Sequence, residues 1–390
     1  MTGVRVLRSL IAFAFLVGAV AARAQQDPGA APPYAAINRA AINYSGPDRE
    51  AARDLAGAEI RIGILVPLQG ARKAEGEALL AAAQMAIEDE SAAPLAGGLG
   101  LKLAVRDEAG LWGRASSELV KLVVDDLAVA LITSAEGRAA HLSEQVGNRL
   151  GVPVLTLASD STSTQINIPW LFRVVPSDTA QARLFAEDIY RTRAFERVLL
   201  VIEGDHDGKV GKEEFEKAAR RLKAPPPTSV EIPAPGSDAE SVAGEISASR
   251  AQAIVVWASA EAAARFLPAL RGLSAEIYVC HKALQEPFLN AARDAHWGRL
   301  WTASVKAASD GRDEFERRFR TRTGAPTTPA AREMYDAVRL IAAGLRDSGP
   351  NRARLRDALA ARGEYHGASG VIAFDGAGNN QAEVALLPVK

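Results

Sequence analysis

The sequence predicts an α/β protein made of parallel β-sheets with helices on both faces. Short apolar runs alternate with segments of roughly 10–15 residues that have helical periodicity, which is the pattern of βαβ units. The run 154–157 is short, branched and apolar throughout, as expected for a strand covered on both faces. Polar loops follow such runs, and ligands of open parallel sheets bind outside the carboxyl ends of the strands. The pattern therefore predicts a fold class and a small-molecule site together.

The clearest part of this pattern is 130–164, with the order strand, polar loop, helix, strand and second polar loop. The apolar run 127–132 ends in Thr-Ser-Ala-Glu-Gly before the helical segment 139–150. Gly151 and Pro153 end this helix, because Gly is favoured just past a helix end and Pro shortly beyond it. Both loops should open on the same side and mark a ligand site. Alternatively, their Ser, Asp and Gly residues serve only as caps and turn formers.

Residues 1–24 have the features of a secretory signal peptide. Arg5 and Arg8 precede the apolar run 10–22, and a small-x-small cleavage site ends at Ala24. Cleavage would leave 390 − 24 = 366 residues. No later stretch approaches about 18 uninterrupted apolar residues, so the mature protein is expected to be soluble.

Composition excludes several classes of protein. The formal net charge of −1 gives no case for nucleic acid or an anionic membrane as partner. The single cysteine, Cys280, excludes an intramolecular disulfide framework, and no cysteine stands at the cleavage site to carry a lipid. Cys280 ends an apolar run and is expected to be buried and inert. A chain of this length is expected to form about two domains, each with its own core.

The other elements follow in order along the chain. Residues 25–58 are rich in Ala, Pro and Gln and are predicted to be a flexible leader. One predicted strand starts at residue 59, and four others span 101–107, 197–202, 253–257 and 276–280. Predicted helices span 76–90, 116–125, 179–191, 211–222, 239–249, 260–270, 287–295, 310–323, 328–348 and 352–361. Residues 203–210 are predicted as a loop, 223–235 as a connector and 365–378 as a hairpin with Gly-rich turns.

Seven motifs, each weak alone, occur in a characteristic order. They are IRIGILVPLQG before a Gly-led helix, LAVRDEAG, GVPVLTLAS, WLFRVVPSD, VLLVIEGDHDGKVGKEEF, MYDAVRLIAAGL and YHGASGVIAFDGAGN. From Ile60 to the C-terminus, the chain thereby resembles the type I periplasmic solute-binding proteins of ABC importers, in particular the branched-chain amino-acid-binding branch.

The resemblance implies two lobes, each a parallel sheet flanked by helices, joined by three hinge crossings and closing on a trapped solute. By position, 59–176 with 305–366 would form the first lobe, and 177–304 with 367–390 the second. It also implies a monomer in the periplasm, not an enzyme and without a cofactor, that captures a small polar solute such as an amino acid or a related charged compound. An ABC permease in the inner membrane would be its partner. The alternative is a ligand sensor or pathway-associated binding protein with no transport role.

The resemblance also places two ligand loops on the first lobe. Their residues are Ser134, Ala135 and Glu136 in the first loop, and Ala158, Ser159 and Asp160 in the second. In relatives, these loops hold the carboxylate of an amino acid through backbone N–H and hydroxyl groups. Here the Ser159 hydroxyl and the N–H groups near Ser161 are expected to do so.

Three positions depart from the family pattern. Glu75 stands where relatives often carry an aromatic residue, Asp207 replaces a Tyr before Gly, and Lys282 stands where an acid often meets the ligand's ammonium. A buried charge must be paired to be tolerated. We therefore expect a polar, charged solute rather than a plain branched-chain amino acid, with the acids meeting its cationic groups and Lys282 a carboxylate or phosphate. Alternatively, these side chains point to solvent, Glu136 being a helix-start acid and Asp207 a turn residue.

Other candidate residues give no further site. Trp257, at a strand end, would supply an apolar wall to the cleft or pack in the core. His206 lies between Asp205 and Asp207, but three adjacent residues cannot all converge on one ion. The remaining histidines are scattered along the sequence, at His141, His281, His296 and His366. No metal site is therefore predicted, and no catalytic motif such as G-x-S-x-G or a P-loop is present.

Overall fold

The computed structural model describes residues 54–57, 59–92, 95, 98–108, 112–165, 168–232, 239–294, 299–305 and 311–389. The predicted signal peptide and nearly all of the predicted leader lie outside these residues, as does His296. Within the described residues, no helix combines the length and apolar character needed to cross a membrane.

The first lobe is built around a five-stranded parallel sheet. Its strands, in spatial order, are β2 (Gly100–Asp107), β1 (Glu59–Val66), β3 (Ala130–Thr133), β4 (Val154–Thr156) and β5 (Leu171–Arg173). Its helices are α3 (Lys73–Ser91), α4 (Trp112–Val124), α5 (Gly137–Leu150), α11 (Arg312–Thr323), α12 (Pro329–Ser348) and α13 (Arg352–Ala361). One face of the sheet packs against α3 and α12, and the other against α4 and α5.

The alternation of side chains along β1 produces these two layers. Ile62 and Ile64 lie in the core beneath α3 and α12, whereas Leu65 lies in the core beneath α4 and α5. Full burial of each such side chain contributes about 1.5–3 kcal/mol. Gly63, on the same face as Leu65, leaves no room for a side chain, because a Cβ there would lie 2.7 Å from Cδ2 of Leu131.

The second lobe is built around a six-stranded sheet. Its strands, in spatial order, are β13 (Val384–Pro388), β10 (Leu300–Val305), β9 (Glu276–Val279), β8 (Ala253–Trp257), β6 (Val198–Glu203) and β7 (Thr228–Ile232). Its helices are α6 (Asp178–Glu187), α7 (His206–Arg221), α8 (Ala239–Ser249), α9 (Ala260–Phe266) and α10 (Glu286–Asp294). All neighbours in the sheet are parallel except β13, which pairs antiparallel with β10.

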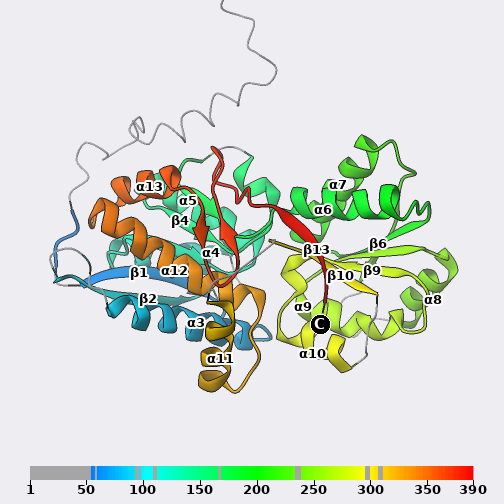
Figure 1. Cartoon of the computed structure of the whole chain (residues 1–390), viewed down its shortest axis with the longest axis horizontal. Coiled ribbons are helices and arrows are strands. Elements are labelled where there is room, and N and C mark those ends of the chain that lie inside the picture. The colour runs from blue at the N-terminus through cyan, green and yellow to red at the C-terminus, as the bar shows by residue number, and fades with distance from the viewer. Residues whose placement is uncertain are drawn as a thin grey trace, which may run out of the picture.

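The chain passes between the lobes three times, and Figure 1 shows the lobes side by side with the red C-terminal segment crossing to the second. It leaves β5 for α6, leaves β10 for α11, and returns from the hairpin of β11 (Tyr365–His366) and β12 (Val371–Ile372) to β13. Phe374 still packs in the core of the first lobe. The exact lobe boundaries expected from the sequence stay a prediction.

The predicted loop 203–210 is wrong, because α7 begins at His206. Asp205 is its N-cap, and the carboxylate accepts a hydrogen bond from the Gly208 N–H at 2.8 Å. Glycines lower the helix propensity of this segment, but packing requires them. A Cβ at Gly208 would collide with the β6 backbone, and one at Gly211 with a tryptophan ring of β8. The correction places His206 and its neighbours at a helix N-terminus.

Four strands have no counterpart among the predicted elements. One is β5, which lies in the motif WLFRVVPSD. β7 lies inside the predicted connector 223–235, where its proline-rich flank hides it, and it is an edge strand paired only with β6. β10 was not predicted, and β13 is an edge strand paired only with β10. β10 and β13 lie far apart in the sequence, so the local pattern of residues could not reveal that they pair.

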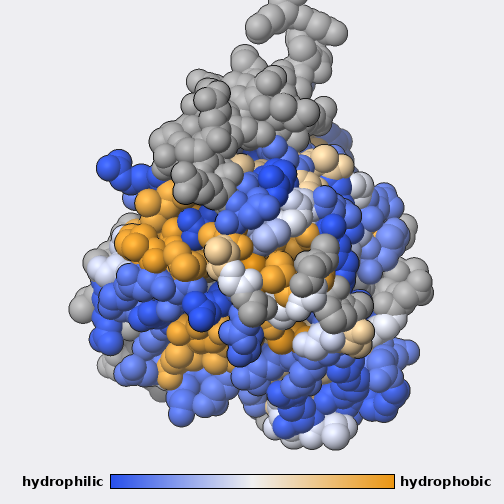
Figure 2. Space-filling view, turned by 90° about the vertical axis from the view of Figure 1, so that its left-hand side faces the viewer, coloured by the Kyte–Doolittle hydropathy of each residue, from blue (hydrophilic) through white to orange (hydrophobic). Residues whose placement is uncertain are grey.

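The outer end of the first lobe is mixed in character, and Figure 2 shows apolar patches there among polar ones. Among the described residues, the large apolar side chains with the highest exposure are Val124 (54%) and Leu127 (51%). Both lie where α4 ends and the chain turns towards β3, away from the loops that follow the carboxyl ends of the strands.

Candidate functional site

The candidate site lies where loops from the carboxyl ends of strands in both lobes meet. Direct contacts between described residues of the two lobes include the following three. Lys282 Nζ lies 3.1 Å from Glu136 Oε1. The Gly137 N–H donates to Asp207 Oδ2 at 3.2 Å. His206 Nε2 lies 2.9 Å from Asp160 Oδ2. The two ligand loops predicted for the first lobe therefore face the second lobe.

Lys282 is the main cation that the second lobe brings to this site. It lies in a short 3-10 turn directly after β9, and only 7% of it is exposed. Its Nζ contacts Asp207 Oδ2 at 2.5 Å, Glu136 Oε1 at 3.1 Å and Asp205 Oδ2 at 3.4 Å. Burial would lower the pKa of Lys282, but the three carboxylates outweigh burial and hold the pKa well above its usual value. The ammonium is therefore charged and joins acids of both lobes.

Arg72 is the corresponding cation of the first lobe. It precedes α3, and its guanidinium contacts Glu75 at 2.8 Å, Glu108 at 3.1 Å and Glu136 at 3.3 Å. Burial would lower the pKa of Arg72, but these carboxylates raise it. The Ser134 hydroxyl donates to Glu108 at 2.5 Å. Burial nevertheless raises the pKa of Glu108 above its usual value.

Glu136 connects the two cations. Burial would raise the pKa of Glu136, but Lys282 and Arg72 outweigh burial and lower the pKa to about 2. The carboxylate is thus ionised at neutral pH. A continuous chain of charges runs from Arg72 through Glu136 and Lys282 to Asp207, and it crosses from one lobe to the other.

A second group of polar side chains surrounds Asp160, whose carboxylate is buried. Oδ1 accepts hydrogen bonds from the N–H and the hydroxyl of Thr162, at 2.8 and 2.7 Å. Oδ2 lies 3.0 Å from His141 Nε2 and 2.9 Å from His206 Nε2. Hydrogen bonds with Asp160 and Glu144 raise the pKa of His141 to about 9. His141 and His206 are far apart in the sequence, but the fold brings their ring centroids to 5.5 Å.

Arg173, at the end of β5, holds the second ligand loop in place. Its side chain is completely buried. The guanidinium donates hydrogen bonds to four oxygens of the loop region, those of Ala158, Asp160, Ser163 and Thr164. A fifth hydrogen bond goes to the side chain of Asn379 on the third crossing. Arg173 thus ties the Asp160 loop to a segment that joins the lobes.

Six of the ten predicted site residues belong to the two groups described above. Glu75, Ser134, Glu136, Asp207 and Lys282 are in the charge network, and Asp160 is at the centre of the second group. The other four lie behind these groups. Ala135, Ala158 and Ser159 are buried beneath the loops. Trp257 is 2% exposed and packs on α7 and on Phe185, which favours the core-packing alternative.

Four members of these groups are not among the residues that the sequence predicted for the cleft. They are Glu108, His141, Asp205 and His206. Glu108 directly follows the predicted strand 101–107, so its position at the carboxyl end of a strand was an available signal. His141 lies inside the helix after the first loop, where only the fold shows that its ring reaches Asp160.

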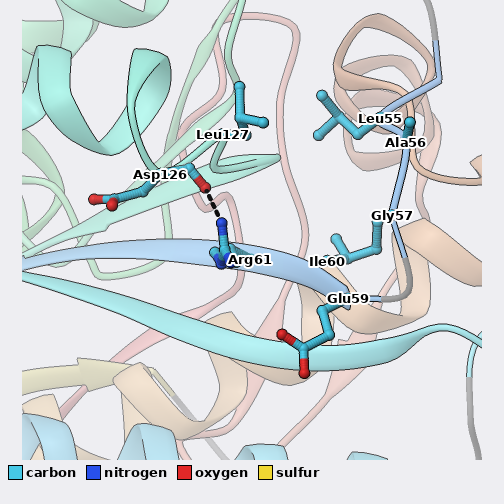
Figure 3. Close-up of a pocket in the computed structure, with 8 residues that line it drawn as sticks. All are labelled: Leu55, Ala56, Gly57, Glu59, Ile60, Arg61, Asp126 and Leu127. Carbon is cyan, nitrogen blue, oxygen red and sulfur yellow. Dashed lines mark hydrogen bonds between the residues drawn. The ribbon is translucent and has the colours of Figure 1, made fainter.

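A pocket of about 260 Å³ lies at the other end of the first-lobe sheet (Figure 3). Its lining residues are Leu55, Ala56, Gly57, Glu59, Ile60, Arg61, Asp126 and Leu127. Arg61 donates to the backbone carbonyl of Asp126 at 3.3 Å, as the dashed line in Figure 3 marks. The pocket is at the amino end of β1, and none of the residues of the charge network line it.

Replacing Gly137 with Ala is expected to weaken lobe closure. Gly137 begins α5, where Ala is intrinsically favoured over Gly by about 0.5–1 kcal/mol. Its Cβ, however, would collide with Asp207 of the second lobe and lie 2.8 Å from Asp160 Oδ2. Small-angle X-ray scattering should show a larger radius of gyration for the variant.

Gly244→Ala is the matched control, because a Cβ at this position in α8 meets nothing within 4 Å. Its scattering curve should equal that of the wild type. An unchanged curve for Gly137→Ala as well would contradict the close contact between the lobes at this helix start.

Cys280 is expected to resist thiol reagents as long as the protein is folded. It is fully buried, and burial raises the pKa of its thiol to about 12. A neutral, inaccessible thiol does not react as a nucleophile. Labelling with a chromogenic disulfide should be absent in buffer and reach one thiol per chain in denaturant; rapid labelling in buffer would contradict this burial.

Comparison with known proteins agrees with this architecture. A model of the family described as periplasmic binding protein matches residues 59–389. A search of curated proteins finds no match. Among solved structures, the branched-chain amino acid transporter substrate-binding protein LivJ from Streptococcus pneumoniae, in complex with isoleucine, is 20% identical with a TM-score of 0.75. That match covers 85% of this chain and 96% of LivJ.

Two further structures show the range of relatives. A putative branched-chain amino acid ABC transporter from Rhodospirillum rubrum is 26% identical, with a TM-score of 0.64 over 85% of this chain and 98% of that one. A solute-binding protein of an ABC transporter from Rhodopseudomonas palustris, in complex with 3,4-dihydroxybenzoic acid, is 16% identical, with a TM-score of 0.75 over 86% and 94%. Because the family model matches most of its length, the chain belongs to the periplasmic binding protein family, and its two-lobed fold is of type I.

Proposed function

We propose that the protein is the periplasmic solute-binding component of an ABC importer and captures a small, positively charged solute between its lobes. Family membership supports the general role. The observation that carries the proposal is the network in which Lys282 of one lobe contacts Glu136 of the other, beside Arg72 and Asp207. Solutes of two-lobed binding proteins are enclosed by hinge closure at such a junction.

The charge balance of the network supports a cationic solute. Its carboxylates are Glu75, Glu108, Glu136, Asp205 and Asp207. Arg72 and Lys282 form ion pairs with them, and the charge of Arg138 also lowers the pKa of Glu136. These acids outnumber the cations, and a buried carboxylate without a partner costs free energy. A solute that enters the site should therefore supply positive charge. An amine or guanidine does so, whereas an anion would compete with acids already bound to Lys282. A zwitterion would place its ammonium among the acids.

A plain aliphatic amino acid is a poor fit to these residues. Trp257 packs in the core, and acids and cations occupy the positions where an apolar side chain would need cover. Desolvating the charges around leucine without new partners would cost free energy. We therefore do not propose isoleucine or dihydroxybenzoate, the ligands of two relatives, as the solute of this chain.

The mature chain from residue 25 is the material for the test, in buffer containing a chelator. Thermal unfolding is measured with amino acids, polyamines, dicarboxylates and small aromatic acids. A true ligand at a hundred times its dissociation constant adds about 2.7 kcal/mol of stability. We expect amines or polyamines to stabilise the protein, and Glu136→Gln to weaken the effect. Stabilisation by leucine, valine or dicarboxylates alone would overturn the cationic assignment.

Transport is tested in the cell. Loss of uptake of the same solute on deletion supports import through a permease. Intact uptake with altered gene expression instead supports the alternative, a sensor with the same fold. The signal peptide, the permease partner and the monomeric state belong to this proposal and are checked by fractionation, co-purification and sedimentation.

A further inference from the structure

The strongest unassigned group in the described residues is the set around Asp160, which the charge network above does not use. His141 comes from α5, Asp160 from the loop after β4, and His206 from the start of α7. One ligand atom of each lies within 4.8 Å of the others. Two imidazoles and a carboxylate are the ligand types of zinc-class ions, and imidazole is also common around copper and nickel.

We propose that His141 Nε2, Asp160 Oδ2 and His206 Nε2 bind a divalent transition-metal ion of the zinc class, and that this ion joins the two lobes. Two ligands belong to the first lobe and one to the second. The complete site therefore exists only when the lobes are closed. A ligand that binds the closed form better shifts the population towards closure, whatever solute the cleft holds.

The spacing of the three ligand atoms is close to that of such a site. Zinc binds imidazole nitrogen at about 2.0–2.1 Å and carboxylate oxygen at about 2.0–2.2 Å in tetrahedral sites, so neighbouring ligand atoms lie roughly 3.3 Å apart. The two nitrogen–oxygen distances here are 3.0 and 2.9 Å, and all three ligand atoms lie within 4.8 Å of one another. Adjustment of the side chains forms the position, and the ion replaces the proton that a histidine otherwise donates to Asp160. Three protein ligands leave a fourth position for water or a solute atom.

Buried partners already orient the ligands. Glu144 Oε2, on a residue that is 2% exposed, lies 3.4 Å from His141 Nδ1. This is the carboxylate–histidine arrangement that fixes ring orientation and directs Nε2 to a metal. Thr162 donates to Asp160 Oδ1 through its N–H and its hydroxyl, which leaves Oδ2 for the ion. The Thr162 hydroxyl oxygen, 2.9 Å from His141 Nε2, faces the same position.

The competing explanation is that the two histidines simply pair with this carboxylate as cations. The experiment below separates a metal site from such an ion pair.

The test uses the mature chain, stripped with a chelator and titrated calorimetrically with zinc chloride. We expect one ion per chain in the wild type and affinity at least tenfold weaker in His206→Gln and in His141→Gln, given that loss of even an outer-shell partner costs about 10–100-fold. His366→Gln is the matched control, because His366 is exposed on β11 and its ring lies 3.4 Å from Glu364, far in sequence and structure from Asp160. It should bind zinc like the wild type. Equal affinity in the wild type and both site variants would overturn the proposal.

Two further readouts test the position of the ion between the lobes. Cobalt(II) should give the intense visible absorption of a tetrahedral nitrogen–oxygen site in the wild type and lose it in His206→Gln. Zinc should reduce the radius of gyration of the wild type but not of His206→Gln. His206 is exposed, so this variant is expected to fold even if His141→Gln does not. Zinc binding that depends on His141 but not on His206 would overturn the link between the lobes.

Failure of this inference and failure of the proposed function are distinguishable. The solute screen is run with chelator present, so its result does not depend on the ion. Zinc binding without any solute leaves the metal site standing and overturns the solute assignment. Solute binding without zinc binding leaves the proposed function standing and overturns the metal site.

Discussion

Replacing Arg173 with Met should lower the free energy of unfolding by at least about 3 kcal/mol, because hydrogen bonds to charged groups contribute roughly 1.5–3 kcal/mol each. The guanidinium is completely buried and makes five such bonds. Burial lowers its pKa, while Asp178, Asp160 and Asp375 favour its charged form. Met fills part of the volume but leaves the loop oxygens without donors. Denaturant unfolding measures the loss.

The same substitution should release the loop that carries Asp160. Zinc and solute affinities are therefore expected to fall together with stability, although Arg173 contacts neither. Arg173→Lys is the first control, since it keeps the charge but not the planar set of donors, and it should recover only part of the loss. Arg183→Met, on the exposed face of α6, should change stability by less than about 0.5 kcal/mol. A similarly small effect for Arg173→Met would contradict its role as the anchor of the loop.

Replacing Lys282 with Met should open the lobes. The change removes the cation shared by Glu136, Asp205 and Asp207. Leaving buried charge without its partner costs about 3–5 kcal/mol if the lobes stay closed. Separation relieves part of that cost, because Glu136 belongs to one lobe and the two aspartates to the other. We expect a larger radius of gyration, lower stability and loss of solute binding.

A double substitution distinguishes charge imbalance from loss of packing. Adding Asp207→Asn to Lys282→Met removes the carboxylate closest to the lysine and should restore part of the stability, giving a coupling energy between the two positions. Lys209→Met, an exposed lysine on α7, is the matched control and should behave like the wild type. If Lys282→Met leaves shape and stability unchanged, the ammonium does not hold the lobes together.

Most of the fold could be predicted because its elements have local causes. The apolar strands and amphipathic helices of the first lobe carry their periodicity in adjacent residues, and β1, α5 and β4 lie where the sequence places them. The start of α7 could not be predicted in this way. Its glycines favoured the prediction of a loop, and only the close approach of the helix to β6 and β8 explains why they are needed. β13 was missed because its partner β10 lies far away in sequence.

The same distinction between local and long-range causes applies to the candidate site. Glu75, Glu136, Asp160, Asp207 and Lys282 were predicted for the cleft because they lie in loops or helix starts aligned with a family pattern. Their pairing was not predicted. A charged side chain has long reach and several possible partners, and which one it meets depends on how two lobes are placed.

The sequence by itself determined that the chain is an α/β protein resembling the periplasmic binding proteins, and it predicted charged residues in the loops expected to bind ligand, because strand and helix periodicity and motif order are properties of neighbouring residues. Only the tertiary structure decided that Lys282 is already bound by three carboxylates and that His141 meets His206 across Asp160. These contacts join residues that lie from 19 to 282 − 136 = 146 positions apart. The free energy of a charge pair depends on the distance between the two groups and on how deeply they are buried, and local sequence determines neither.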